Sequence, residues 1–437
     1  MKKRYALVGT GGRSYMFQAA LADTYKATSE LVAFCDLNQT RMDLANRRRK
    51  EKHALAPLPT YGPQQFDDMV KMHKPDVVIV TCIDRLHHHY IIRAMELGCD
   101  VISEKPMTVD DEKAREIIAA KKRTGRKLTV TFNYRYSPRN TKVKELIHSG
   151  AIGDVVSVHF EWMLDTAHGA DYFRRWHRDK RNSGGLLVHK STHHFDLVNW
   201  WLASIPEEVF AWGRLAFYGR ENAERRGVTE FYQRVKGSAT AAKDPFALNI
   251  DDKATQEMYL DAEKEDGYQR DQSVFGDGIN IEDTMSLLVK YRNRAVLTYS
   301  LNAFCPWEGY RVMFNGTHGR IEMNIVERPF LIPKGADPAD PSYADKGDGG
   351  ERQTIRLQRL WHKAENITWE EGKGGHGGGD GRMLKEIFEG ANTSDPLRTA
   401  ANHVDGLKSI IVGIAGNHSL NRGLPVRVKD LVDIDQA

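Results

Sequence analysis

The sequence predicts an α/β protein in which a doubly wound parallel sheet is followed by a second, differently built domain. Over the first 135 residues, short β-branched apolar runs alternate with amphipathic stretches of helical length. A glycine-rich turn, "VGTGG", directly follows the first of these runs. After about residue 150 the apolar segments become longer and alternate with polar residues, which is typical of antiparallel strands with one solvated face.

The first domain, predicted over residues 1–135, is expected to hold five parallel strands. Their sequences are "YALVG", "ELVAFCD", "DVVIVT", "DVIS" and "KLTVTF". These runs are apolar throughout, so helices should cover both faces of the sheet. Gly98 and Gly125 follow helical stretches, where a helix end favours a residue with positive φ.

The second domain, predicted over residues 136–437, begins with four alternating segments: "VVSVHFEWML", "EEVFAWGRL", "TMSLLVKYR" and "RAVLTYSLNA". A polar stretch at about 219–277 is too long for a simple connector, so we interpret it as an insertion that forms a lid or an oligomer contact. An amphipathic helix is expected at about 399–420.

Composition excludes several classes of protein. The 437 residues exceed the roughly 250–300 at which one core stops growing, which favours two domains. Lys and Arg exceed Asp and Glu by only 63 to 59, so we expect no nucleic-acid partner. The four cysteines show no CxxC spacing, and the sequence contains no apolar run of roughly 18 residues. These features predict free thiols, no membrane partner and a cytoplasmic location.

The glycine turn is the first candidate functional element. Gly9, Gly11 and Gly12 stand between a predicted strand and a predicted helix, where they would allow a pyrophosphate to approach the helix N-terminus. Ser14 occupies the third position of the G-x-G-x-x-G pattern, and a small residue suffices there for close packing. The pattern predicts a dinucleotide site.

Asp36 ends the second predicted strand, where a carboxylate can bind the ribose hydroxyls of NAD. The alternative is a turn aspartate ahead of a helix capped by Asn38. Arg13 and Arg41 are near enough in sequence to accommodate a 2′-phosphate. We therefore expect NAD as the cofactor, with NADP possible, and we expect Asn38 to be among the residues that contact it.

Residues 184–202, "GGLLVHKSTHHFDLVNWWL", allow three interpretations. His189 and His193 at i,i+4 could bind a metal from one helical face, although Lys190 between them opposes a cation. Ser191 or Thr192 could cap an ordinary amphipathic helix. The third interpretation is an acid/base site.

Ordered motifs along nearly the whole chain carry a family resemblance: "VGTGGRS", "DVVIVTCIDRLHHHYIIRAMELGCDVISEKPM", "FNYRYSP", "ELIHSGAIGDVVSV" and "GGLLVHKSTHHFDLVNWWL". In these motifs the chain resembles the glucose-fructose oxidoreductase, inositol dehydrogenase and MocA family. The resemblance implies a Rossmann domain followed by an α/β domain with a large, open, mostly antiparallel sheet that often forms oligomer contacts.

The resemblance also implies site residues. Lys105 matches the lysine that reaches both nicotinamide and substrate, with Glu104 and His87 in the same cofactor site and Pro106 on a cis bond. In the family pattern D-x-G-x-H-x-x-D, His193 matches the acid/base histidine, and His189 stands at the aspartate position. We expect His189, His193 and Lys105 to be catalytic. The predicted substrate-binding residues are Lys190, His194, Asp196, and, from "GGHGGGDGRM", His376 and Asp380.

The function that these features predict is NAD(P)-dependent hydride transfer to or from a sugar, polyol or related hydroxy compound. Two alternatives stay open: a glycoside hydrolase that oxidises and re-reduces its substrate through NAD, and a noncatalytic sugar or cofactor sensor. The resemblance implies a homodimer or homotetramer through the sheet of the second domain.

Overall fold

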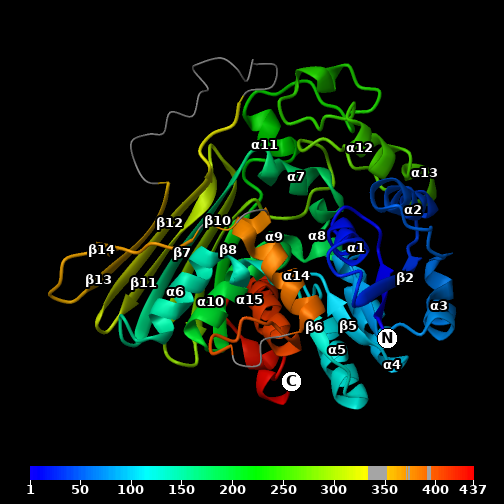
Figure 1. The fold of residues 1–437 in the computed structure, drawn as a ribbon. Coiled ribbons are helices and arrows are strands. Elements are labelled where there is room, and N and C mark those ends of the chain that lie inside the picture. Colours follow the sequence, from blue (N-terminus) through cyan, green and yellow to red (C-terminus); the bar gives the residue numbers. More distant parts are fainter. Residues whose placement is uncertain (333–351, 371, 373–374, 391–394) are drawn as a thin grey trace.

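The computed structural model describes residues 1–332, 352–370, 372, 375–390 and 395–437, and its first sheet is wholly parallel. The six strands lie in the order β3-β2-β1-β4-β5-β6 (Figure 1). Their bounds are β1 Lys3–Val8, β2 Ser29–Cys35, β3 Thr60–Tyr61, β4 Val77–Val80, β5 Asp100–Ser103 and β6 Leu128–Val130. The predicted strands are confirmed, and β3 is an additional short edge strand.

Helices connect the parallel strands. They are α1 Ser14–Ala22, α2 Gln39–His53, α3 Phe66–His73, α4 His87–Glu96 and α5 Asp111–Thr124. Asn38 caps α2 through a side-chain bond to the Arg41 amide, and Asp110 caps α5 in the same way. Gly125 ends α5 in the left-handed conformation, as its position in the sequence predicts.

The second sheet has nine strands in the order β14-β13-β12-β11-β7-β10-β9-β8-β15. Its pairs are antiparallel except for β7 with β10, so the predicted mostly antiparallel sheet is confirmed. The bounds are β7 Val155–Asp165, β8 Pro206–Arg214, β9 Thr284–Tyr291, β10 Val296–Cys305, β11 Glu308–Gly316, β12 Gly319–Arg328, β13 Gln353–Arg359, β14 Glu365–Asn366 and β15 Val426–Arg427.

A layer of helices lies between the two sheets (Figure 1). It includes α6 Pro138–His148, α9 Gly185–His189, α10 Thr192–Leu202 and α15 His403–Arg422. The helix α10 is buried on every side, and α15 packs on both β8 and β6. The predicted late helix is therefore α15, which begins after the capping residue Asn402.

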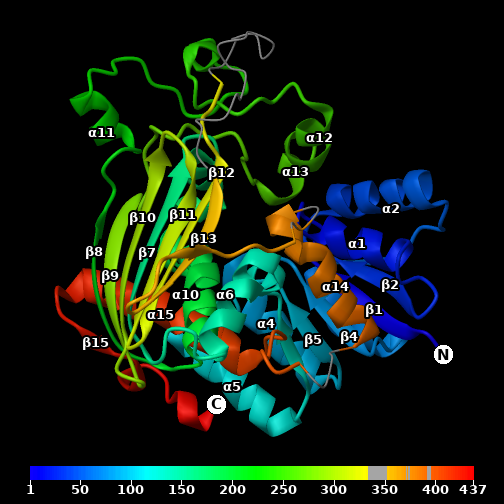
Figure 2. The ribbon, with the colours of Figure 1, turned by 60° about the vertical axis from the view of Figure 1, so that its left-hand side comes forward.

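Two segments from the second half of the chain pack against the domain that holds the parallel sheet. Helix α14, Gly379–Glu389, packs Phe388 against Tyr5 and Tyr25. The insertion at 219–277 extends from the end of β8 to α2 (Figure 2). It carries α11 Arg220–Arg225, η5 Thr240–Lys243, α12 Lys253–Thr255, the π-helical turn η6 Gln256–Leu260 and α13 Glu263–Asp266. In the described part of the chain, no helix is long and apolar enough to cross a membrane.

Candidate active site

The glycine turn between β1 and α1 leaves room for a ligand. Gly9 has φ +87°, and a Cβ there would lie 2.5 Å from the Cys82 backbone nitrogen, so only glycine fits. A Cβ on Gly11 would meet no protein atom within 4 Å, which leaves that side of the turn open. The Ser14 hydroxyl donates to the Gly11 carbonyl at 2.6 Å and ties α1 to the turn. The cradle fits a dinucleotide pyrophosphate at the N-terminus of α1.

Asp36 lies beside this turn, just beyond β2. One carboxylate oxygen accepts hydrogen bonds from the Thr10 amide at 2.5 Å and the Thr10 hydroxyl at 2.8 Å. The other accepts from the Asn38 amide at 2.9 Å. The turn interpretation and the ribose interpretation are therefore compatible, because the side chain is held at the turn and stays partly exposed.

Asn38 and Arg41, predicted to contact the cofactor, are engaged by the insertion instead. The Asn38 amide donates to the Ala262 carbonyl at 2.8 Å. The Arg41 guanidinium donates to Asp266 at 2.5 Å and to the Met258 carbonyl at 3.1 Å. The expectation that Arg41 is available for a 2′-phosphate is wrong in this structure, because a carboxylate already neutralises it.

Arg13 joins the glycine turn to two other chain segments. Its Nε donates to Glu104 at 2.7 Å, and its Nη2 lies 3.3 Å from Asp380. Asp380 also accepts from the Asn133 side chain at 2.7 Å. The structure thus brings three predicted site residues together and places Asp380 beside the predicted cofactor residues. The backbone of His376 lies in η8, Gly375–Gly378, and its side chain is outside the described residues.

His87 holds the turn that carries Lys105. Its ring nitrogens lie 2.8 Å from the Pro106 carbonyl and 3.1 Å from the Cys82 carbonyl. Burial lowers the pKa of this imidazole, and both of its nitrogens face backbone. The structure therefore favours a positioning role over the predicted cofactor contact. The Lys105–Pro106 bond is cis, as the resemblance implies.

Lys105 follows β5 at the carboxyl edge of the parallel sheet. Its ammonium donates to the His189 carbonyl at 3.3 Å, so the two predicted catalytic segments meet. Burial lowers the pKa of Lys105 to about 8, against the opposing charges of Glu104 and Asp84. A lysine with this pKa can accept or donate a proton near neutrality.

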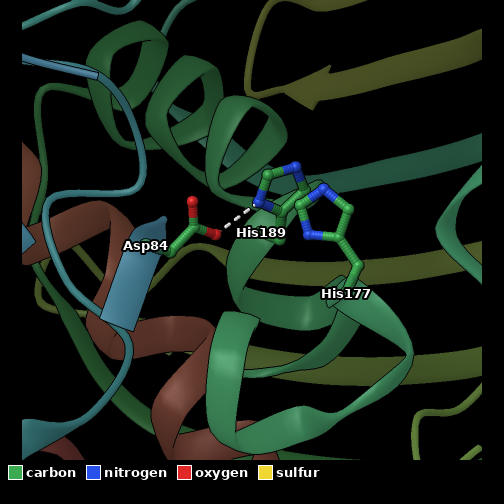
Figure 3. A group of neighbouring side chains, drawn as sticks. All are labelled: Asp84, His177 and His189. Atoms are coloured by element: carbon green, nitrogen blue, oxygen red, sulfur yellow. Dashed lines mark hydrogen bonds and ion pairs between the residues drawn. The ribbon is translucent and has the colours of Figure 1, made fainter. Parts of the chain in front are cut away.

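His189 shares a hydrogen bond with Asp84, a residue that the sequence interpretation missed. The His189 Nδ1 lies 2.5 Å from an Asp84 carboxylate oxygen (Figure 3). Asp84 is buried at the start of η2, Asp84–Leu86, the first element after β4. The family pattern expects a carboxylate at position 189. Here an imidazole occupies that position, and the first domain supplies a carboxylate beside it.

His177 completes a group of three side chains with metal-binding atoms. Its ring centroid lies 3.9 Å from that of His189, and neither of its buried nitrogens has a hydrogen-bond partner. Ligand atoms of His177, His189 and Asp84 all lie within 4.8 Å of one another (Figure 3). Two imidazoles and a carboxylate could hold zinc or iron.

The cationic side chains near these three residues disfavour a bound metal cation. The pKa of His189 is far below its usual value because of burial, with further lowering by the cationic Lys105 and Arg175. His189 also ends α9, whereas His193 belongs to α10. His189 and His193 therefore do not share one helical face, because α9 ends before α10 begins. The interpretation of these two residues as a metal-binding pair on one helix is wrong.

His193 and Lys190 lie toward the nine-stranded sheet. The His193 ring is 4.7 Å from the ring of Tyr134 and 6.3 Å from that of Phe132. The Lys190 ammonium lies 4.6 Å from the centre of the Trp162 ring. Lys190 is close enough to Lys105 for its charge to lower the pKa of that group. These side chains extend the polar site toward the sheet.

His194 and Asp196, which the sequence predicts to bind substrate, each have a partner within the protein. His194 stacks on Trp162 and shares a 2.7 Å hydrogen bond with the Tyr299 hydroxyl. Asp196 is bound by both arms of Arg135, at 2.8 and 2.6 Å, and both side chains are 1% exposed. Since Arg135 binds both of its oxygens, Asp196 anchors α10.

A glycine turn with a strand-end carboxylate and a lysine of lowered pKa defines an enzyme, a dinucleotide-dependent dehydrogenase or reductase. Two family models match the chain. "Oxidoreductase family, NAD-binding Rossmann fold" covers residues 3–132, and "Oxidoreductase family, C-terminal alpha/beta domain" covers residues 144–428. The chain belongs to the glucose-fructose oxidoreductase, inositol dehydrogenase and MocA family, and its first domain is the NAD-binding Rossmann fold of that family.

Relatives agree with this assignment. The chain is 37% identical to the putative oxidoreductase YteT of Bacillus subtilis strain 168, over 98% of both chains. It is 26% identical to inositol 2-dehydrogenase of Rubrobacter xylanophilus, over 47% of this chain and 54% of that one. The crystal structure of aldose-aldose oxidoreductase from Caulobacter crescentus with glycerol shares the fold, with TM-score 0.60, 18% identity and coverage of 98% of this chain and 100% of that one.

Proposed function

We propose that the protein transfers a hydride between NAD(H) and a secondary alcohol or ketone carbon of a sugar, polyol or sugar derivative. The observation that carries the proposal is the contact of Lys105 with His189, which is itself paired with Asp84, at the carboxyl edge of the parallel sheet. The nicotinamide supplies or accepts the hydride when it is bound. Relatives named for inositol and aldose support the substrate class.

Lys105 is the group that moves the hydroxyl proton. Its pKa of about 8 allows the neutral amine to accept a proton during alcohol oxidation and the ammonium to return it during reduction. The His189 Nδ1 shares a hydrogen bond with Asp84, and in the tautomer that carries its proton on Nδ1 the Nε2 atom is an acceptor for a substrate hydroxyl. Lys190, whose charge acts on both Lys105 and His189, and His193 supply further polar contacts to the substrate.

A substrate panel tests the proposal. Purified protein is incubated with NAD⁺ and a set of sugars, inositols and glycosides, and NADH and glycoside cleavage are followed together. We expect NADH formation with a sugar or polyol, and loss of turnover in Lys105→Met with retained NAD⁺ binding. Glycoside cleavage without net NADH would support the redox-assisted hydrolase instead. Unchanged turnover in Lys105→Met would contradict the proposal.

We also infer that the protein forms a homo-oligomer through the outer face of its nine-stranded sheet. Apolar side chains lie exposed on that face, with Trp212 68% and Leu288 50% exposed. Phe210 lies opposite Leu288 in the β8–β9 pair, so these side chains form one patch. A second copy of the chain would bury this patch.

A further inference from the structure

The insertion places two carboxylates on the start of α2. The Thr40 amide donates to both oxygens of Glu265 at 3.1 Å, and the Thr40 hydroxyl also donates to Glu265. One residue further on, the Arg41 guanidinium is paired with Asp266, and these side chains are only 11% and 10% exposed. Both acidic residues come from α13 and its end, more than two hundred positions along the chain from α2.

This part of α2 is where a dinucleotide domain distinguishes its two cofactors. Asp36, at the end of β2, is placed for the ribose hydroxyls of NAD. An NADP site needs an arginine or free helix amides nearby to bind the 2′-phosphate. Here Thr40 and Arg41 provide such donors, and the carboxylates of Glu265 and Asp266 already occupy them.

The local charge adds to this effect. Three carboxylates lie near the start of α2: those of Asp36, Glu265 and Asp266. Arg41 lies in the same region, and its charge is balanced by Asp266. A phosphate dianion placed there would have to displace Glu265 from the helix N-terminus and would face the remaining negative charges. The ribose 2′-hydroxyl of NAD carries no such charge.

We propose that Glu265 and Asp266 of the insertion take the position of a 2′-phosphate and thereby make the protein selective for NAD(H) over NADP(H). The selectivity is then determined by two parts of the chain: Asp36 favours the ribose hydroxyls, and the insertion excludes the phosphate. The proposal concerns cofactor binding and does not depend on the identity of the substrate.

The test is equilibrium binding of NAD⁺ and NADP⁺ to the full-length protein, measured by calorimetry without substrate. We expect the wild-type protein to bind NAD⁺ at least about a hundredfold more tightly. The double variant Glu265→Gln, Asp266→Asn keeps the hydrogen-bond acceptors and removes both charges. We expect it to lower the NAD⁺/NADP⁺ affinity ratio by about tenfold or more, mainly through tighter NADP⁺ binding.

Glu257→Gln is the matched control. Glu257 pairs with Arg47 at 2.9 Å, further along α2. The substitution therefore removes a carboxylate of the insertion that lies away from the start of the helix. We expect this variant to keep the wild-type ratio. Equal affinity of the wild-type protein for both cofactors would overturn the proposal, as would a double variant whose ratio is unchanged while its melting temperature stays at the wild-type value. The single variant Glu265→Gln provides the same measurement if the double variant does not fold.

Discussion

At the scale of single residues, the acid/base role of Lys105 has a defined pH dependence. Its pKa is lowered from the usual lysine value to about 8, and Glu104, Asp84, Lys190 and Arg13 are the charged groups that act on it. Only the neutral amine accepts a proton, so kcat/KM for alcohol oxidation should rise as pH increases through about 8. Ketone reduction should show the opposite trend.

Initial rates over a pH series, with NAD⁺ saturating, measure this dependence. In Lys105→Met the remaining activity should lack the rise near pH 8. Lys144→Met is a matched control, because burial lowers the pKa of Lys144 to about 8 as well, while its ammonium binds backbone carbonyls of Trp200 and Trp201. A profile that keeps its rise in Lys105→Met would assign the titration to another group.

Asp84 is expected to act through His189. In Asp84→Asn the imidazole loses the carboxylate that holds its Nδ1 proton, and we expect kcat to fall by about a hundredfold with little change in NAD⁺ affinity. The double variant Asp84→Asn, His189→Asp moves the carboxylate to the position that the family pattern expects. Partial recovery of kcat in the double variant would distinguish a proton-positioning role from a merely structural one.

Metal analysis tests the alternative for the same residues. Because Lys105 and Arg175 surround the group formed by Asp84, His177 and His189 with positive charge, we expect purified protein to hold no stoichiometric transition metal. Activity should also survive a chelator. Retained zinc or iron that is lost in His177→Ala would instead show that these side chains form a metal centre.

Asp84 could have been found from the sequence, whereas His177 could not. Asp84 follows the strand "DVVIVT", at the same carboxyl edge that holds the glycine turn and Lys105. A strand-end carboxylate at that edge is a site candidate on topology alone. His177 reaches the site through η4, Trp176–Arg178, whose place depends on packing between distant segments. No pattern in the surrounding sequence indicates that contact.

At the scale of elements, α10 is held by a buried ion pair. Asp196 on α10 is bound bidentately by Arg135 of η3, Asn133–Tyr136. Removing the carboxylate leaves the buried guanidinium with only the more distant carboxylate of Asp405, so Asp196→Ala should lower the free energy of unfolding by about 3 kcal/mol. Denaturant unfolding measures the loss.

Asp405→Asn gives a comparison, because the partly exposed Asp405 contacts the same arginine at 3.3 Å. We expect this variant to lower the free energy of unfolding by less than Asp196→Ala does. If Asp196→Ala changed the substrate KM without lowering stability, the result would support the substrate contact that the sequence predicts for Asp196.

The elements that the sequence predicts least well are the short ones. The long strands β7 to β10 carry apolar alternation that matches their observed burial, as in β9. Strands β3, β14 and β15 have two residues each, too few for any period to appear. The break between α9 and α10 is similarly hidden, since Lys190 and Ser191 do not interrupt a helical pattern.

At the scale of the whole molecule, the exposed sheet face predicts association. Trp212→Glu places a charge within the patch formed with Phe210 and Leu288, so it should shift the oligomer toward monomer. Light scattering coupled to size-exclusion chromatography measures the mass. Lys122→Glu, at an exposed position on α5 away from this sheet face, is a control for added negative charge. A wild-type monomer would contradict the inferred oligomer.

The sequence predicts the division into two sheets but not how later segments return to the first. Phe388 of α14 packs on Tyr5 and Tyr25, and Asp380 meets Arg13, although these partners are separated by most of the chain. Such contacts depend on surface shape and not on local periodicity. The length of the insertion makes it recognisable in the sequence. Its attachment to α2 is not, because it depends on the ion pair between Arg41 and Asp266.

That attachment has a kinetic consequence. The Tyr259 hydroxyl lies 3.5 Å from where a Cβ on Gly12 would be, and the Ala262 carbonyl accepts a hydrogen bond from Asn38, so the same segment joins the glycine turn to the start of α2, where we expect the adenosine of the cofactor. Nucleotide exchange then requires this bridge to detach, and the residence time of NAD depends on the rate of detachment.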